Sequence, residues 1–522
     1  IITIIFHFSY KLEGFSLRTK AFLKNGIIIL AVQMFTYLMD FLCRTVFIYT
    51  LSMDYVGVKG LFNNILSILS LTELGISSVL IYSMYKPMAE NDTDKLLALV
   101  AFYNKAYQMI ACLVGGIGLV LTPFLPYLIK DCPELDGLYV IYLLYLANSV
   151  LSYLFTYKMS LFQAEQKLYV CTFWSCAFST LRNIVQIICL FLTGNFFLYL
   201  IIQLPFTLLN NLFLSRKAEK EYPFLKTEEY PSLSKEEKKS LMKNTFAMFN
   251  HRIGATILNS TDNVIISRFV GLTAVAINDN YVLITNMINQ VMNQIFSALT
   301  ASVGNLNVTE SPETSYKVFK ILHFASFWFY SFCTICLFVL LNPFIELIFG
   351  EKYLFSLPVV AMICLNFYIV GIRKIPIIFK ESMGLLWQDR FKPLIEAALN
   401  LIISIIAVHY LGTTGVFIGT FISMVSTSLW VEPYVLFKYG LKMSWRNFWL
   451  NNAKYFLIFL MMITLTYFVG TLYNGQLLYE FIYKVVICIF LPNILLLLLF
   501  HQSEEFKGLL SSINIKGLLH HD

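Results

Sequence analysis

Two opposite charges stand four residues apart in a long apolar run near the start of the chain. The run covers residues 26–51 and carries Asp40 and Arg44 within the stretch YLMDFLCRTVFIY. Four residues turn a helix by about 400°, so both side chains lie on one face, where they can pair. A charge at the centre of a bilayer costs about 2.5–3.5 kcal/mol on insertion scales, so such residues are rare and usually functional.

Two interpretations of Asp40 and Arg44 remain open. In the first, their helix face lines a water-filled cavity, where Arg44 binds an anion and Asp40 serves as its counter-charge. In the second, the two residues form a structural ion pair that locks the first helix to a neighbour. Exchanging the two charges would preserve a structural pair and would destroy an anion site.

Basic residues recur in the apolar segments along the whole chain, and there they outnumber the two aspartates, Asp40 and Asp262. They are Arg44, Arg182, Arg252, Arg373 and Lys374. Such an excess suits an anionic passenger such as a pyrophosphate, because the planar guanidinium matches phosphate oxygens. We therefore expect Arg44, Arg252, Arg182 and Arg373 to bind substrate. For Arg373 and Lys374 the alternative is that they snorkel to the membrane surface.

Two glutamates, Glu73 in LTELG and Glu396 in LIEAALN, also lie within apolar segments. A carboxylate in such surroundings can exchange a proton or hold a cation during transport. Together with Asp40 and Asp262, these residues are candidates for ion coupling. The alternative is that each glutamate makes a hydrogen bond between helices.

No motif of an enzyme or a metal site is present. The DTD at residues 92–94 is similar to the metal-binding DxD of glycosyltransferases, but Thr93 or Asp94 as a helix N-cap explains it better. The sequence contains no HExxH, GxSxG or P-loop, and its seven His show no ligand spacing. Cys333 and Cys336 form a CxxC inside an apolar helix, without polar company. We expect no catalytic residue, no cofactor and no metal, and therefore no enzyme.

The composition explains which elements position these charges. Of 522 residues, 58% are hydrophobic and 13% charged, and the mean hydropathy is +0.70. This balance is typical of a polytopic membrane protein. The first ten residues have no leading charge and no small-residue cleavage site, so we expect no signal peptide.

The apolar segments predict about fourteen transmembrane helices in an all-α fold. We expect them at residues 26–51, 58–85, 106–129, 137–157, 168–193, 196–214, 244–270, 274–300, 321–349, 355–379, 393–411, 414–437, 453–473 and 478–500. With this count, 28 of the 38 Lys and Arg fall on the side of the N-terminus, four on the other side and six within spans. By the positive-inside rule, both termini lie in the cytoplasm. The same distribution accounts for the net charge of +7 without a nucleic-acid partner.

The two halves show a weak internal similarity. Arg44 and Asp262 begin comparable runs, RTVFIYTL and DNVIISRF, about 218 residues apart. This favours two pseudo-repeated lobes around a central cavity. We expect an N-terminal lobe at 1–214, a cytoplasmic linker at 215–243, a C-terminal lobe at 244–437, and the last two helices with a cytoplasmic tail at 438–522.

Several stretches resemble a known family over essentially the whole chain, in order. They are residues 60–95 (GLFNNILSILSLTELGISSVLIYSMYKPMAENDTDK), 151–167 (LSYLFTYKMSLFQAEQK), 258–271 (LNSTDNVIISRFVG), 298–307 (ALTASVGNLN) and 380–405 (KESMGLLWQDRFKPLIEAALNLIISI). They are similar to the polysaccharide-repeat-unit (Wzx-type) flippases of the multidrug/oligosaccharidyl-lipid/polysaccharide transporter superfamily. The resemblance implies fourteen helices, two lobes and a central cavity. It also implies transport of a polyprenyl-pyrophosphate-linked oligosaccharide to the outer leaflet of the cytoplasmic membrane, for cell-surface polysaccharide synthesis.

Three other functions remain open. A multidrug or cation antiporter of the same superfamily would share the architecture, but its cavity should be acidic or aromatic. A lipid II-type flippase would share a basic cavity. A membrane polysaccharide polymerase or ligase would need a large external loop, which this sequence does not predict. For the flippase we expect lipid-linked oligosaccharide and membrane lipids as partners, and also polysaccharide polymerase and chain-length machinery.

Overall fold

The computed structural model describes residues 17–70, 76–130, 137–165, 167–227, 231–385, 387–473 and 475–512. Within these ranges the chain is helical throughout and contains no β-strand. Its contacts divide it into two compact units, which we call the first unit (Lys24–Asp279) and the second unit (Asn280–Asp522 together with Ile1–Leu23). The division falls inside the long helix α11 (Leu272–Thr309). The lobe boundaries expected from the sequence stay a prediction.

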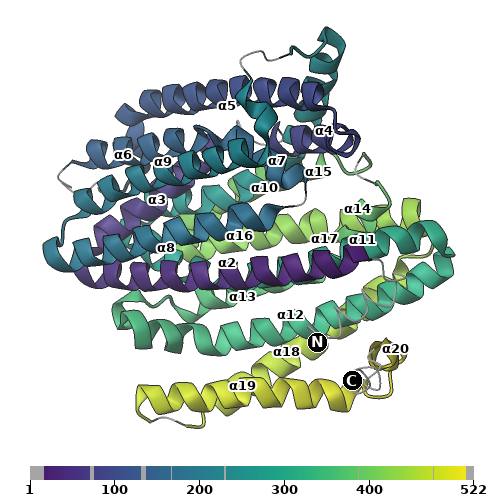
Figure 1. The fold of residues 1–522 in the computed structure, drawn as a ribbon. Helices are drawn as coiled ribbons and strands as arrows, with labels where there is room; N and C mark the ends of the chain where they lie inside the picture. The colour runs from purple at the N-terminus through teal and green to yellow at the C-terminus, as the bar shows by residue number, and fades with distance from the viewer. Residues whose placement is uncertain are drawn as a thin grey trace, which may run out of the picture. The chain divides into compact units, whose positions relative to one another are not determined.

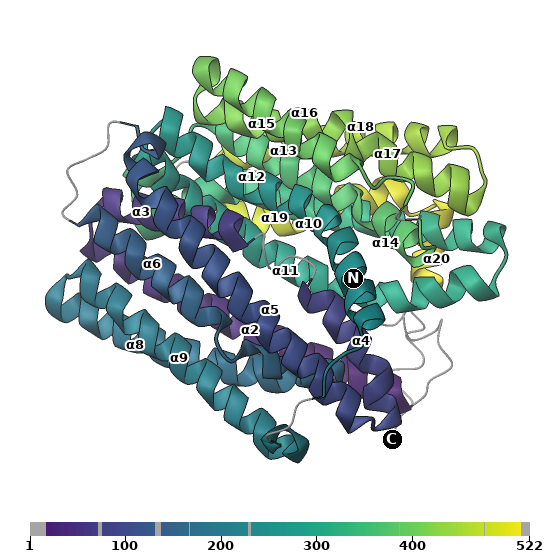
Figure 2. The same cartoon turned by 90° about the horizontal axis from the view of Figure 1, so that it is seen from above.

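The first unit consists of helices that are mostly long enough to cross a bilayer. They are α2 (Leu17–Thr50), α3 (Met53–Leu69), α4 (Ile76–Glu90), α5 (Thr93–Leu121), α6 (Leu138–Tyr153), α7 (Met159–Ala164), α8 (Leu168–Thr193), α9 (Phe196–Glu221) and α10 (Lys235–Phe269) (Figure 1). Helix α9 packs against α6 and α8, and α6 packs against α5 (Figure 2). Helix α3 packs against α10, and these two helices carry Lys59 and Asp262.

Polar caps define the helix ends in this unit. The side chain of Asp92 accepts a hydrogen bond from the backbone N–H of Lys95, so Asp92 is the N-cap of α5. The DTD stretch is therefore a helix start, as expected, but the cap is one residue earlier than Thr93. Ser234 and Glu237 form a capping box at the start of α10.

The second unit is organised around one long helix, α12 (Pro312–Phe349), which packs against α13, α18, α19 and α20. Its other helices are α13 (Leu357–Ile372), α14 (Lys374–Ser382), α15 (Lys392–Leu411), α16 (Thr413–Ser426), α17 (Ser428–Val435), α18 (Arg446–Gly470), α19 (Leu477–Phe500) and α20 (Glu504–Ser512). Aromatic rings fill the space between α12, α18 and α19: Phe327 stacks on Tyr455 at a centroid distance of 4.3 Å. Both rings belong to the buried core of the unit.

Helices α15 and α16 approach each other closely because two glycines four residues apart face α15. A methyl group on Gly415 would lie 2.3 Å from the carbonyl oxygen of Ala407, and one on Gly419 would lie 2.1 Å from Ser404 Oγ. This is the small-residue packing that transmembrane helices use in place of hydrophobic association. The hydroxyl of Ser404 donates to the carbonyl of Val416 at 3.1 Å and adds a hydrogen bond between the two helices.

The chain is an all-α polytopic membrane protein. In the described ranges, eleven helical segments are long and apolar enough to cross a membrane. Three of the expected spans do not meet that standard. Span 58–85 is divided between α3 and α4, and spans 244–270 and 274–300 form α10 and α11, which are long but rich in polar residues. These polar helices carry part of the candidate site.

Candidate functional site

Asp40 and Arg44 do not serve mainly as each other's partners, as their spacing had suggested. The ion pairs recorded for them connect α2 to two different places in the first unit. Asp40 Oδ1 lies 3.9 Å from Arg182 Nη2 on α8 and accepts a 2.7 Å hydrogen bond from the side-chain amide of Asn183. Asn183 in turn accepts from Arg182, at 3.3 Å from Nη2. The buried Asn183 thus bridges a carboxylate and a guanidinium that are themselves loosely paired.

Arg44 pairs with a carboxylate on a different helix. Its Nη1 atom lies 3.7 Å from Asp279 Oδ2, on α11. The other oxygen of Asp279 accepts a 2.9 Å hydrogen bond from Asn263 on α10, and Asn263 accepts one of 2.7 Å from Asn278. The amides therefore hold the Asp279 carboxylate in place from one side, while Arg44 faces it from the other.

Two glycines of α3 make room for this arrangement. A methyl group on Gly60 would lie 2.3 Å from Asp279 Oδ2, and one on Gly57 would lie 2.3 Å from the carbonyl oxygen of Leu272. The carboxylate therefore rests directly on the α3 backbone. Between the glycines stands Lys59, whose ammonium donates to the hydroxyl of Tyr199 at 2.9 Å and lies 4.7 Å from the ring centre of Phe47.

We call Asp40, Arg44, Lys59, Arg182 and Asp279 the N-terminal charge cluster. It holds three cations and two carboxylates, a net charge of +1 when all are ionised. Sequence reasoning missed Lys59, which was counted in an outer loop although it lies in α3. It also missed Asp279, whose signal was its position inside the apolar stretch VAINDNYVLIT.

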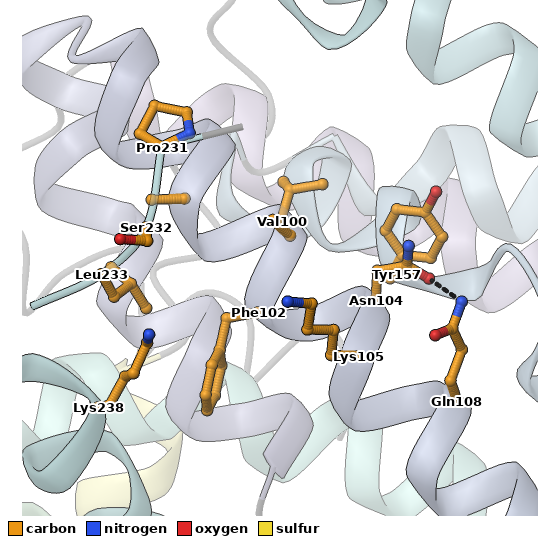
Figure 3. A pocket seen from close by; sticks show the side chains of 12 residues that line it. Val100, Phe102, Asn104, Lys105, Gln108, Tyr157, Pro231, Ser232, Leu233 and Lys238 are labelled. Atoms are coloured by element: carbon orange, nitrogen blue, oxygen red, sulfur yellow. Dashed lines mark hydrogen bonds between the residues drawn. The ribbon is translucent and has the colours of Figure 1, made fainter. Parts of the chain in front are cut away.

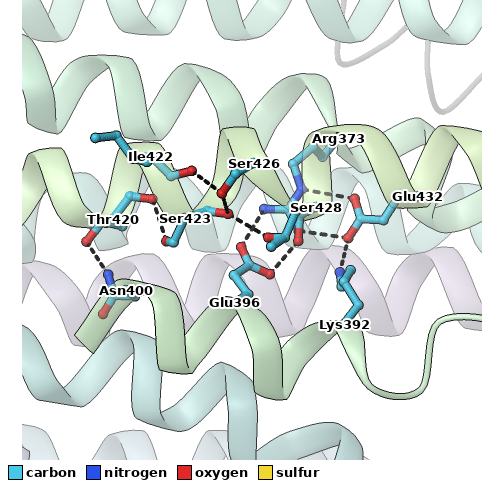
Figure 4. Close-up of polar contacts among 11 residues, drawn as sticks. Arg373, Lys392, Glu396, Asn400, Thr420, Ile422, Ser423, Ser426, Ser428 and Glu432 are labelled. Atoms are coloured by element: carbon cyan, nitrogen blue, oxygen red, sulfur yellow. Dashed lines mark hydrogen bonds and ion pairs between the residues drawn. The ribbon is translucent and has the colours of Figure 1, made fainter. Parts of the chain in front are cut away.

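A second group of charges lies within the other unit (Figure 4). Arg373, between α13 and α14, donates two hydrogen bonds to Glu432 on α17: Nε to Oε2 at 2.9 Å and Nη2 to Oε1 at 2.8 Å. Its Nη1 lies 3.6 Å from Glu396 Oε1 on α15. Lys392 at the start of α15 also contacts Glu432, and Ser428 donates to Glu396. We call Arg373, Lys392, Glu396 and Glu432 the C-terminal charge cluster.

The C-terminal charge cluster is neutral and enclosed. Its two cations balance two carboxylates, and only 4% of the Glu396 side chain and 2% of the Glu432 side chain are exposed. A row of polar contacts continues from it along α15 and α16, where Asn400 donates to Thr420 at 2.9 Å. Sequence reasoning missed Glu432, although a glutamate in the apolar span 414–437 was a visible signal, and it assigned Lys392 to a loop.

The predicted site residues are thus divided between the two units. Arg44, Arg182 and Asp40 belong to the N-terminal charge cluster, whereas Arg373 and Glu396 belong to the C-terminal one. Asp262 lies half-buried on α10, next in sequence to Asn263. Arg252 is also on α10, but its side chain is outside the described residues, and so is Glu73 as a whole. The roles expected for all of them stay predictions.

A comparison with known protein families identifies the family of the chain. The model of the family described as polysaccharide biosynthesis protein matches residues 22–300, more than half of the chain. The chain belongs to this family. The resemblance noted in the sequence is thereby confirmed, and the matched range contains the whole N-terminal charge cluster. The search of curated proteins found no match to the chain.

Solved structures of the same superfamily share the fold of the chain. The lipid II flippase MurJ in an inward closed conformation has a TM-score of 0.64 at 15% identity, over 91% of this chain and 99% of its own. An inward-facing multidrug resistance MATE family transporter of the MOP superfamily has a TM-score of 0.61 at 14% identity, over 78% and 98%. At such identities the likeness establishes the architecture.

Proposed function

We propose that this protein flips polyprenyl-pyrophosphate-linked oligosaccharide repeat units across the cytoplasmic membrane, by alternating access coupled to an ion gradient. Membership of the polysaccharide biosynthesis protein family supports the role in surface polysaccharide synthesis. The observation that carries the proposal is the N-terminal charge cluster, where three cations face two carboxylates on helices of a membrane protein. An uncompensated positive charge in such a place favours an anionic passenger.

The ion-pair distances suggest how a pyrophosphate would bind. Charge-assisted hydrogen bonds between nitrogen and oxygen are usually about 2.7–2.9 Å long. Arg44 lies 3.7 Å from Asp279 and Arg182 lies 3.9 Å from Asp40, both beyond that range. Phosphate oxygens could replace Asp279 and Asp40 as the closer partners of these two guanidiniums. In the proposal, Arg44 and Arg182 bind the pyrophosphate.

Coupling follows from the carboxylates that the substrate would displace. When phosphate oxygens replace Asp40 as the partner of Arg182, Asp40 keeps only the hydrogen bond from Asn183. A carboxylate that loses its cation favours protonation or a bound cation, so substrate and coupling ion would occupy the site together. We propose Asp40 as the coupling residue, with Glu73, Asp262 and Glu396 as further candidates.

The remaining predicted site residues have different support. Arg373 has carboxylate partners for Nε, Nη1 and Nη2, so its contacts favour a structural role over substrate binding. Arg252 stays a candidate substrate ligand on the grounds of sequence alone.

Both termini are proposed to be cytoplasmic, with polysaccharide polymerase and chain-length machinery as partners. A cysteine introduced at Ser232 in a Cys-depleted protein should be labelled only after the cells are permeabilised.

A lipid II-type flippase is the second candidate, because the fold of the lipid II flippase MurJ covers 91% of this chain. Both substrates present a pyrophosphate to the same basic residues, so the charges do not separate them. The MATE fold is also shared, but the cation excess of the N-terminal charge cluster disfavours a transporter of cationic drugs.

The test is a flipping assay with the purified full-length protein in liposomes. The vesicles carry polyprenyl-pyrophosphate-linked oligosaccharide or lipid II, and an enzyme added outside modifies only outer-leaflet glycan. We expect the protein to expose oligosaccharide faster than empty vesicles do, and Arg44→Gln to lower this rate at least tenfold. Lys484→Gln is the matched control, since Lys484 is a span cation paired with Glu480 on its own helix.

Each result decides between the candidates. Flipping of lipid II alone would replace the proposed substrate with the second candidate. Flipping of neither lipid, by a protein that is folded and monodisperse, would contradict the transport proposal. A rate unchanged after collapse of proton and sodium gradients would exclude ion coupling.

A further inference from the structure

A cavity of about 470 Å³ lies in the first unit, among residues of α5, the 3₁₀ turn Thr156–Lys158 and the segment that leads into α10. None of the residues that line it belongs to the N-terminal charge cluster. Its volume is within the range of ordinary small-molecule sites, about 300–1,000 Å³. In the predicted topology this part of the chain faces the cytoplasm.

The lining of this cavity is basic. Lys105 from α5 and Lys238 from α10 both line it, on either side of Phe102 (Figure 3). None of the twelve described lining residues is acidic. No ion pair is recorded for Lys105 or Lys238 with any carboxylate in the described part of the chain. By contrast, Lys95, on the same helix as Lys105, pairs with Glu237, the residue before Lys238. Two ammonium groups thus face one hollow without a counter-charge.

Neutral polar groups accompany the two lysines. Asn104 and Gln108 follow one helical turn apart on α5, and Gln108 donates a 3.3 Å hydrogen bond to Asn104. Ser232 lines the opposite end, beside the segment that leads into α10 (Figure 3). Side-chain amides, hydroxyls and ammonium groups are the donors that bind phosphate oxygens, whereas the ring of Phe102 offers an apolar floor for whatever carries the phosphate.

The wall formed by the start of α10 is held in place. The capping box of Ser234 and Glu237 fixes the first turn of this helix, and the Glu237 carboxylate is also paired with Lys95 on α5. These contacts hold the pKa of Glu237 at about 2, well below its usual value, chiefly through the hydrogen bond from Lys95. The carboxylate next to Lys238 in sequence is therefore already engaged with Lys95.

We propose that this cavity binds a phosphate-bearing anion, either the headgroup of an anionic lipid or a free phosphorylated compound, between Lys105 and Lys238. The site is separate from the pyrophosphate site of the proposed function and does not depend on it. Its occupant would supply the counter-charge for the two ammonium groups and would join α5 to the start of α10.

The experiment measures thermal unfolding of the full-length protein in phosphatidylcholine nanodiscs, where the bilayer itself carries no net charge. One arm adds phosphatidylglycerol to the bilayer, and the other adds glucose 1-phosphate to the buffer. We expect one probe to raise the midpoint by several degrees, and the rise to fall at least threefold in Lys105→Gln/Lys238→Gln. The arm that responds identifies the source of the phosphate.

The control is Lys235→Gln/Lys239→Gln, which removes the same charge from exposed lysines of the same helix start that do not line the cavity. An equal loss of response in this control would reduce the effect to non-specific attraction and overturn the proposal. A midpoint that neither probe moves would also overturn it. Without ligand, Lys105→Gln/Lys238→Gln should be at least as stable as the control; a clearly lower midpoint would mean that the lysines are structural.

Discussion

The two charge clusters contain the same kinds of residue and hold them in opposite ways. In the C-terminal charge cluster, Arg373 makes two hydrogen bonds of 2.8 and 2.9 Å to one carboxylate, and the charges balance. In the N-terminal charge cluster, the recorded ion pairs are 3.7 and 3.9 Å long, amides occupy the carboxylate oxygens, and one positive charge remains. A bidentate, neutral group stabilises a fold, whereas a loosely paired and positive one is suited to receive an anion.

Exposure separates the Asp40–Arg182 pair from the C-terminal charge cluster. Glu432 and Glu396 are almost entirely enclosed by protein, but 41% of the Asp40 side chain and 26% of that of Arg182 are exposed. Arg44, at 9%, is as enclosed as Arg373, at 11%. A charge that must exchange partners needs a path to them, and a charge that only holds helices together does not. The contrast teaches that intramembrane charge by itself does not identify a transport site; pair geometry and charge balance do.

The largest effect is expected where the pairing is tightest. Glu432→Gln would leave Arg373 and Lys392 buried without their shared carboxylate, and breaking a buried pair in this way costs about 3–5 kcal/mol. We expect little folded protein in the membrane, measured as the monodisperse fraction after extraction. Glu480→Gln, which breaks a pair within one helix, should have little effect. Normal yield and melting of Glu432→Gln would show that the C-terminal charge cluster is not structural.

The converse is expected in the N-terminal charge cluster. The double substitution Asp40→Arg and Arg182→Asp exchanges the two charges of one ion pair in this cluster. The net charge stays the same, but the guanidinium moves from α8 to α2. We expect folded protein within a factor of two of the original and glycan flipping reduced at least tenfold, a difference of about 1.4 kcal/mol or more in the barrier. If the exchanged protein flips substrate normally, Arg182 is not an anion site and the pair is only structural.

A steric change should separate position from charge. Gly60→Ala places a methyl group where Asp279 Oδ2 now lies, so the carboxylate must move away from the α3 backbone. Overpacking of this kind costs about 1–3 kcal/mol, which thermal unfolding can measure. Gly116→Ala is the control, because its methyl group would meet nothing within 4 Å. Equal unfolding midpoints of the two variants would mean that the close approach of Asp279 to Gly60 does not contribute to stability.

The smallest effect concerns a pair outside the spans expected from the sequence, Glu237 with Lys95. Because the folded-state pKa of Glu237 is about 2 and its usual value is 4.5, the stabilisation is present above about pH 4.5 and is lost as the pH falls towards 2. The pair is solvent-accessible, so its contribution is only about 0.2–1 kcal/mol. Glu237→Gln should lower the unfolding midpoint slightly at pH 7, and this difference from the original protein should vanish near pH 2–3. A difference that is constant over this range would show that ionisation is not the cause.

The sequence predicted the fold better than the site. Long apolar segments predict a polytopic helical protein, because a bilayer requires apolar helices of that length. The distribution of basic residues supports the expected order of the loops. Assigning basic residues at the ends of apolar segments to loops missed Lys59, which lies within α3. Sequence reasoning also passed over Asp279 and Glu432, because each becomes meaningful only through a partner far along the chain. The spacing of Asp40 and Arg44 allows an i,i+4 ion pair within one helix, but the recorded ion pairs of these residues are with Arg182 on α8 and Asp279 on α11.

The C-terminal charge cluster also bears on how the protein is made. Its members emerge from the ribosome in the order Arg373, Lys392, Glu396 and Glu432, so the first cation is synthesised 59 residues before the carboxylate that it binds. Until α17 arrives, Arg373 has only the looser 3.6 Å contact with Glu396 and lacks the carboxylate that accepts its two hydrogen bonds, so part of the insertion cost of its charge is not offset. The glycine-packed hairpin of α15 and α16 stands between the two and can assemble by itself through its close contacts. We therefore expect α13 to wait at the membrane surface or beside the insertion machinery, and biogenesis of this half to complete only when Glu432 has entered the bilayer.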